Sequence, residues 1–268
     1  MLELEIVLIL LLAGSAAGLI AGLFGVGGGI VVIPVTLWIL DMQGVDSEYI
    51  QHLAIGTSFS VMMFTTFISS WGHYRKKSIR WDILKPMVPG IILGAIGGSL
   101  LASHIPSKGL QYVFIIFAYG ISLKTLIGFN PKSSWSLPGT AGIFGVGSLI
   151  GSVSSLLGIG GGVFNVPFML SCKVPVKQAI GTSAALSWGI AITGAISYLL
   201  SGLKVDDLPE GSLGFWYLPI ALALVVTTSI FAPLGVRLAH RLSSARLQIV
   251  FGILLFAVTT QILFKWVL

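Results

Sequence analysis

Long runs of hydrophobic residues, separated by short polar segments, recur along the whole chain. Examples are residues 4–24, 83–103, 110–128 and 247–267. Each run has about 20 residues, which is the length of an α-helix that crosses the hydrocarbon core of a bilayer. The runs do not alternate between apolar and polar positions, as the strands of a membrane β-barrel do. We therefore predict an all-α polytopic membrane protein.

The composition agrees with this prediction. Hydrophobic residues make up 55% of the 268 residues and charged residues only 9%, whereas roughly a quarter of a soluble domain is charged. We do not expect the first run to be a cleaved signal peptide, because Glu3 and Glu5 stand where a signal peptide has basic residues. The single cysteine, Cys172, excludes an intrachain disulfide and a multi-cysteine metal site.

The sequence repeats itself after about 130 residues. A glycine-rich segment that starts at Gly25 (GVGGGIVVIP) matches a segment that starts 133 residues later at Gly158 (GIGGGVFNVP). An Ala-Ile-Gly-Thr-Ser segment at 54–58 returns 125 residues later at 179–183. The chain therefore consists of two related halves that form one membrane domain.

Matching loops of the two halves carry opposite charges. The loop at residues 75–85 has five basic residues, whereas the corresponding loop at 204–210 has three acidic residues and one lysine. Because basic residues collect in cytoplasmic loops, the two loops should face opposite sides of the membrane. We therefore predict two inverted repeats, residues 1–130 and 131–268, with both chain ends outside. Inverted repeats are typical of secondary transporters.

Inversion requires an odd number of membrane crossings in each half. The apolar runs that follow the glycine segments, residues 30–40 and 163–171, are short, since eleven helical residues extend only about 16 Å. We therefore predict, for each half, three full spans plus a broken-helix hairpin whose glycine tip lies within the membrane. This gives eight to ten membrane segments, with ten strict crossings as the alternative.

The consecutive glycines are the strongest candidate for a binding site. Broken backbone inside a membrane is tolerated only where it is buried in protein or lines a wet cavity. The helix that follows begins with N–H groups that lack an intrahelical partner, at the positive end of the helix dipole, which suits an anion. Two such helix ends from opposite sides predict a substrate site at the midplane. The alternative is that the glycines only allow close helix packing.

Polar residues near the glycines complete the predicted site. The Thr-Ser pair of each repeated segment offers hydroxyls that can hold an anion or bond a neighbouring helix. Asn165 stands where the first half has Val32, so it either orients a ligand or makes an interhelical hydrogen bond. The predicted substrate-binding residues are Gly25, Gly27, Gly28, Gly29, Thr57, Ser58, Gly158, Gly160, Gly161, Gly162, Asn165, Thr182 and Ser183.

Other classes of function are disfavoured. The nine acidic residues all lie in predicted loops or at chain ends, which argues against coupling to a cation through buried carboxylates. We expect Lys124 to snorkel to the inner surface, and His52 and His73 to be interfacial. The net charge of +6 reflects basic cytoplasmic loops rather than nucleic-acid binding. We find no catalytic pair, metal-ligand spacing or cofactor motif, so we expect no enzyme, metal or cofactor.

These paired motifs resemble the TauE/SafE sulfite exporter family. The resemblance rests on both glycine segments with their following proline, both Ala-Ile-Gly-Thr-Ser segments, and the segments 232–235 and 238–242, and it covers nearly the whole chain. It implies a transporter of the bacterial inner membrane that exports sulfite, a sulfonate or a related anion. An importer of such an anion, or a non-transporting assembly or scaffold protein, is the alternative. The expected partners are a small anion and the lipid bilayer, with a homodimer left open.

Overall fold

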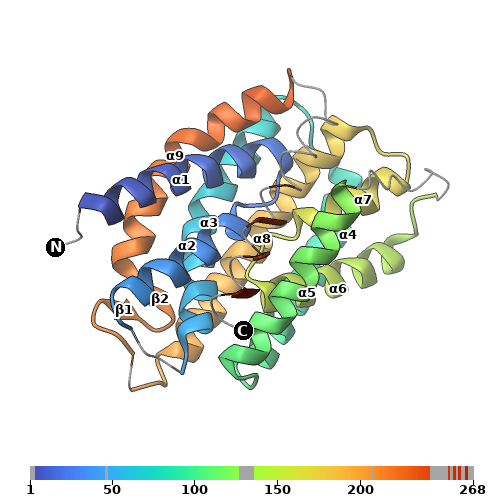
Figure 1. The fold of residues 1–268 in the computed structure, drawn as a ribbon. Coiled ribbons are helices and arrows are strands. Elements are labelled where there is room, and N and C mark those ends of the chain that lie inside the picture. The colour runs from blue at the N-terminus through green and yellow to red at the C-terminus, as the bar shows by residue number, and fades with distance from the viewer. Residues whose placement is uncertain are drawn as a thin grey trace.

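The computed structural model describes residues 4–45, 48–126, 136–206 and 208–241, with single residues 253, 256, 257, 259, 260, 263 and 264. Helices dominate this part of the chain (Figure 1). They are α1 (Leu4–Phe24), α2 (Gly29–Met42), α3 (Ile50–Arg75), α4 (Trp81–Ala102), α5 (Ser107–Leu126), α6 (Thr140–Leu157), α7 (Gly162–Ser171), α8 (Val176–Gly202) and α9 (Leu218–Ala239). The all-α prediction needs one small correction. Strands β1 (Ser212–Leu213) and β2 (Trp216–Tyr217) pair as an antiparallel hairpin before α9.

Six of the described helices are long and apolar enough to cross a membrane, namely α1, α3, α4, α6, α8 and α9. The protein is therefore a multi-pass helical membrane protein, as predicted. The outer faces of these helices agree, since Leu12, Leu222 and Ile230 are 74%, 65% and 61% exposed and need lipid as their solvent.

The set of spans differs from the expected one. Helix α1 has the span length of the apolar run predicted over residues 4–24, and α6 has span length too, although we expected both to serve as first legs of hairpins. Helix α5, which we expected as a full span, is not among the six. The helices that follow the glycine loops, α2 and α7, are short, as expected. Helices α2 and α7 have 14 and 10 residues, or about 21 and 15 Å, well below the roughly 30 Å of a bilayer core. The expected last span, 247–267, lies largely outside the described residues, as does the side chain of Lys124.

Helix α1 packs along α9 through small residues. Gly14 of α1 lies against Thr227 of α9. Gly22, two turns later, lies against Ala232, so the two helices run in the same direction. Backbones approach this closely only where glycine leaves room for them.

Helix α4 packs along α6 in the same way. Gly90 of α4 lies against Phe144 of α6, and Gly98, two turns later, lies against Ser152. These two helices therefore also run in the same direction. The first half thus supplies one partner, and the second half the other, at both of these interfaces.

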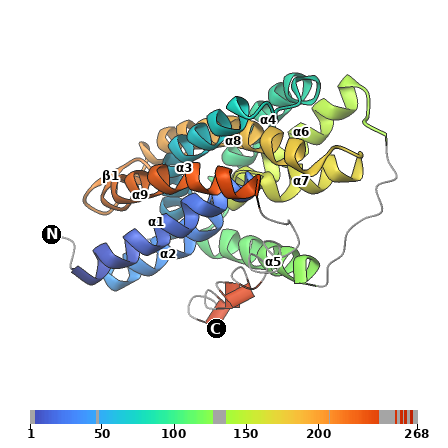
Figure 2. The same ribbon diagram turned by 90° about the horizontal axis from the view of Figure 1, so that it is seen from above.

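Helices α3 and α8 cross antiparallel in the middle of the molecule. The ring of Phe59 packs on that of Tyr198 (5.7 Å between centroids). Further along α3, Phe67 packs on Trp188, an earlier residue of α8 (5.3 Å). Figure 1 shows α3 and α8 between the α1–α9 pair on one side and the α4–α6 pair on the other. Figure 2 shows α5 on the opposite side of the molecule from α4 and α8.

Candidate functional site

The two glycine-rich segments, residues 25–29 and 158–162, touch each other in the interior; we call them the first and second glycine loops. The amide of Gly160 donates to the carbonyl of Val26 (3.2 Å). A Cβ on Gly29 would collide with the carbonyl oxygen of Gly158, and one on Gly162 with that of Gly25. The first loop also lies against Met62, halfway along α3. The loops therefore meet in the middle of the molecule, and the glycines are what allows it.

A left-handed glycine starts the short helix after each loop. Gly28 (φ 83°) is the N-cap of α2, and Gly161 (φ 72°) is the N-cap of α7. Glycine adopts this conformation readily and other residues do not. The carbonyl of Gly161 accepts from the amides of Phe164 (3.0 Å) and Asn165 (2.8 Å). The chain can thus reverse inside the protein and begin a new helix there, with its positive end at the loop junction.

Ser58 and Ser183 each bind the glycine loop of the opposite half. Ser58 Oγ donates to the carbonyl of Gly158 (3.0 Å). Ser183 Oγ donates to the carbonyl of Gly25 (3.2 Å), which also accepts from Ser187 (2.8 Å). We had named Ser58 and Ser183 for substrate binding, and the structure does bring them to the glycine loops. Their bonds show that they brace the junction between the halves.

Thr57 and Thr182 point to the starts of other helices. The amide of Tyr217, the N-cap of α9, donates to Thr57 Oγ1 (2.9 Å). The amide of Arg80, the N-cap of α4, donates to Thr182 Oγ1 (2.9 Å). Each threonine therefore satisfies a backbone amide in the other half. The two threonines therefore bond neighbouring helices, which is the predicted alternative to substrate binding.

Two further side chains close the ends of α1 and α6. His73 Nε2 lies 3.2 Å from the carbonyl oxygen of Gly22 in α1. At the matching positions in the second half, Tyr198 donates to the carbonyl of Ser155 in α6 (3.1 Å). Carbonyls in the last turn of a helix need such partners. The same offsets of 125 and 133 residues that relate the sequences therefore also relate these contacts.

His52 and His73, which we predict to be interfacial, stand near opposite ends of α3. They are 2% and 1% exposed and lie inside the protein. His52 Nε2 lies 3.0 Å from the carbonyl oxygen of Ala102, the last residue of α4, and His73 Nε2 lies 3.2 Å from that of Gly22. Each histidine therefore meets a carbonyl near the end of another helix, and its depth in the membrane stays a prediction.

The second glycine loop has polar neighbours that the first lacks. Ser154 and Asn165 are fully buried (0% exposed), and neither Ser154 Oγ nor the two amide atoms of Asn165 have a hydrogen-bond partner among the described residues. A Cβ on Gly161 would lie 3.0 Å from Ser154 Oγ and 3.3 Å from Asn165 Nδ2. Asn165 was predicted from the sequence as a site residue, whereas Ser154 was not. A signal was present, since Ser154 matches an alanine, Ala21, in the first half.

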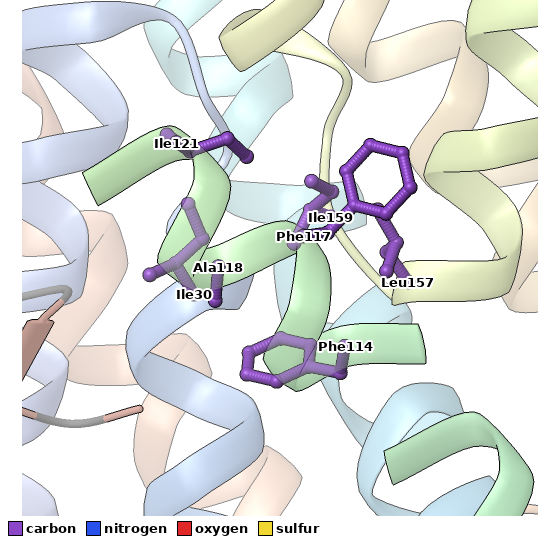
Figure 3. A pocket seen from close by; sticks show the side chains of 7 residues that line it. All are labelled: Ile30, Phe114, Phe117, Ala118, Ile121, Leu157 and Ile159. Atoms are coloured by element: carbon purple, nitrogen blue, oxygen red, sulfur yellow. The ribbon is translucent and has the colours of Figure 1, made fainter. Parts of the chain in front are cut away.

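An apolar recess lies beside the same loops (Figure 3). Its wall combines four residues of α5 with residues next to or within the two loops; they are Ile30, Phe114, Phe117, Ala118, Ile121, Leu157 and Ile159. Helix α5 therefore covers the glycine junction with apolar side chains. Within the described ranges, no group of three or more His, Cys, Asp or Glu residues lies close enough together to hold a metal ion.

Comparison with known proteins covers nearly the whole chain. The model of the family "Sulfite exporter TauE/SafE" matches residues 10–262. A probable membrane transporter protein of Haemophilus influenzae is 31% identical, over 97% of this chain and 98% of its own length. One of Methanocaldococcus jannaschii is 28% identical, over 95% of both chains, and one of Bacillus subtilis is 25% identical, over 96% and 97%. No solved structure matches significantly.

Proposed function

The chain belongs to the TauE/SafE sulfite exporter family, and from this premise we propose that it exports a small oxyanion, such as sulfite or a sulfonate, by alternating access. The family and the relatives are named as transporters, not enzymes. The observation that carries the proposal is the junction of the two glycine loops. Two helices, α2 and α7, begin there inside a membrane protein, and their positive ends favour an anion.

Inverted symmetry of the two halves is part of this proposal. Helices α1 and α9 run in one direction, and α3 shares it, because Thr65 and Gly72 of α3 meet Thr228 and Val236 of α9 in the same order. Helix α8 runs opposite to α3, and so does α4, which follows α3 after a short turn; α6 runs parallel to α4. Each matched pair, α1 with α6, α3 with α8 and α4 with α9, therefore has one member in each direction. An axis in the membrane plane produces this pattern.

The packing suggests which parts move. The α1–α9 and α4–α6 interfaces are close-packed through glycine, and each should move as a unit. The glycine loops lie between these two units, beside the crossing of α3 and α8 (Figure 1). Rocking of one unit against the other would expose the loops first to one side of the membrane and then to the other.

The direction of transport follows from the membrane potential. An interior-negative membrane favours the exit of an anion by about 2.3 kcal/mol per charge per 100 mV. Export therefore needs no coupling ion. The resemblance to the family supports a location in the bacterial inner membrane, and the charges of the loops favour both chain ends on the periplasmic side.

Reconstituted liposomes test the proposal. The purified protein should release labelled sulfite, and release should accelerate when a potassium gradient with valinomycin makes the interior negative. Thiosulfate, sulfonates and small carboxylates form the comparison panel, and liposomes without protein are the control. Absence of flux with every anion of the panel would contradict the proposal. Flux that a negative interior slows would contradict the direction.

A further inference from the structure

We propose that Ser154 and Asn165, together with the first amides of α7, hold the charged group of the substrate, so that the second half alone supplies the polar contacts. This inference rests on the transport function proposed above. It assigns to that site a residue that the sequence analysis did not name, Ser154, and a definite role for Asn165.

Burial without partners is the first argument. Among the described residues, neither Ser154 Oγ nor the amide oxygen and nitrogen of Asn165 is hydrogen-bonded, although all are fully buried. A buried polar group without a partner is unfavourable, and such groups in native proteins call for an explanation. Valine occupies the position of Asn165 in the first half. A ligand that bonds these atoms explains why the second half keeps the polar residues.

Convergence on one helix end is the second argument. Both side chains face Gly161, the N-cap of α7, at 3.0 and 3.3 Å from the position of its absent Cβ. The carbonyl of Gly161 takes the amides of Phe164 and Asn165, which leaves those of Gly162 and Val163 at the positive end of the helix. Serine, asparagine and these amides together offer several neutral donors to one anion.

The choice of donors defines the substrate class. Asn165 presents one donor group and one acceptor, whichever way its amide is turned. A small oxyanion that carries one proton, such as hydrogen sulfite, can accept from the amide nitrogen and donate to the amide oxygen. Neutral donors hold an anion less tightly than an arginine fork does, which suits a transporter that must release its substrate.

Burial also implies that the site is occluded in this conformation. Ser154 lies in α6, Asn165 in α7, and Ile190 of α8 also lies against Gly161, next to the position of its absent Cβ. The substrate therefore reaches these residues only when the helices around α7 separate. This agrees with a site that opens to one side of the membrane at a time.

Substitution by the residues of the first half tests the inference. Asn165→Val and Ser154→Ala introduce the counterparts Val32 and Ala21. Thr36→Val is the matched control, because Thr36 Oγ1 is equally buried and lacks a partner among the described residues, but it lies in α2. Initial rates of labelled sulfite transport in liposomes give KM, and thermal unfolding with and without sulfite gives the shift in Tm caused by binding.

The expected result separates binding from folding. KM should rise roughly ten- to a hundredfold in Asn165→Val, since a hydrogen bond to a charged group is lost, and the sulfite-dependent shift in Tm should disappear. Without sulfite, Tm should stay the same or rise, because an unpartnered amide is removed. Thr36→Val should keep the KM and the Tm shift of the wild type.

Three outcomes overturn the inference. An Asn165→Val protein with the KM and Tm shift of the wild type would overturn it and leave the transport proposal intact. If Asn165→Val lowers Tm without sulfite, Ser154→Ala decides, since it removes only one oxygen; an unchanged KM there overturns the inference. A wild-type protein that neither transports nor binds any anion of the panel would overturn the transport proposal as well.

Discussion

The two glycine loops share a left-handed glycine before the following helix but differ in their side-chain surroundings. Both reverse the chain with a left-handed glycine, and both have a carbonyl that accepts from a serine of the opposite half. The second loop, however, has Ser154 and Asn165 where the first has Ala21 and Val32. Duplication has thus preserved what the fold needs, which is the turn and its brace. The two unpartnered polar side chains are present only in the second half, where we propose that they hold the substrate.

The ends of α1 and α6 show a second difference. His73 caps the end of α1, whereas Tyr198 holds the matching carbonyl of α6. The ring of His73 lies 5.5 Å from that of His240, which stands at the end of α9. The matching residue after α4 is Ser103. Two histidine rings therefore lie together at the ends of α1 and α9, where the matching positions in the other half hold a tyrosine and a serine.

The strongest test of the contact between the two loops is Gly162→Ala. Its Cβ would meet the backbone of the first loop at Gly25 and Val26, which has no room to move, so we expect a loss of stability of about 3 kcal/mol or more. Gly29→Ala should lose a similar amount of stability, because its Cβ would meet the carbonyl oxygen of Gly158. Gly97→Ala is the control, because a Cβ there meets nothing within 4 Å, and in a helix it should raise stability slightly. Wild-type Tm for Gly162→Ala would mean that the loops do not touch.

Moving the polar residue into the first half tests the difference between the loops. Val32 is 1% exposed, and Val32→Asn would bury an amide there, at an expected cost of about 1–3 kcal/mol. Val176→Asn, at an exposed position in α8, is the control and should change Tm little. If Val32→Asn is as stable as the wild type, the first loop accommodates polar groups as well as the second, and the contrast between the halves fails.

The serines that bond the two glycine loops should contribute to stability in proportion to the number of their hydrogen bonds. The carbonyl of Gly25 accepts from Ser183 and Ser187, and that of Gly158 accepts from Ser58. Each bond contributes about 1 kcal/mol, so the Ser183→Ala/Ser187→Ala double variant should lose about twice as much stability as Ser58→Ala. Ser148→Ala is the control, since that exposed hydroxyl bonds only its own helix. Equal losses in chemical or thermal unfolding would argue against this assignment.

The smallest expected effect concerns protons at His240. Burial, and then repulsion by Lys177 and Lys76, lowers the pKa of His240 below 6.5. The unfolded chain then binds the proton more readily, so this residue has no effect above about pH 6.5 and destabilises the fold as the pH falls below it. His240→Gln should reduce the loss of Tm between about pH 7.5 and about pH 5.5. His104→Gln, at an exposed position, should not, and an identical loss in all three proteins would contradict the assignment.

Much of the architecture was predictable because it depends on local properties. Long apolar runs such as that of α4 predict spans through the free energy of transfer into lipid. Three consecutive glycines predict a break in the helix, wherever the rest of the chain lies. The partners of the final carbonyls of α1 and α6 were less predictable, since these carbonyls meet residues far away in the sequence, His73 and Tyr198.

The sequence alone therefore determined the membrane class, the two related halves, the glycine breaks and the family. Only the tertiary structure decided what the polar residues do. Ser58 and Gly158 are 100 residues apart, and their bond exists because the halves pack across each other. Ser154 and Asn165 converge only because Gly161 turns the chain between them. Hydrophobic length is a property of one segment, whereas a hydrogen-bond partner is set by the packing of distant segments.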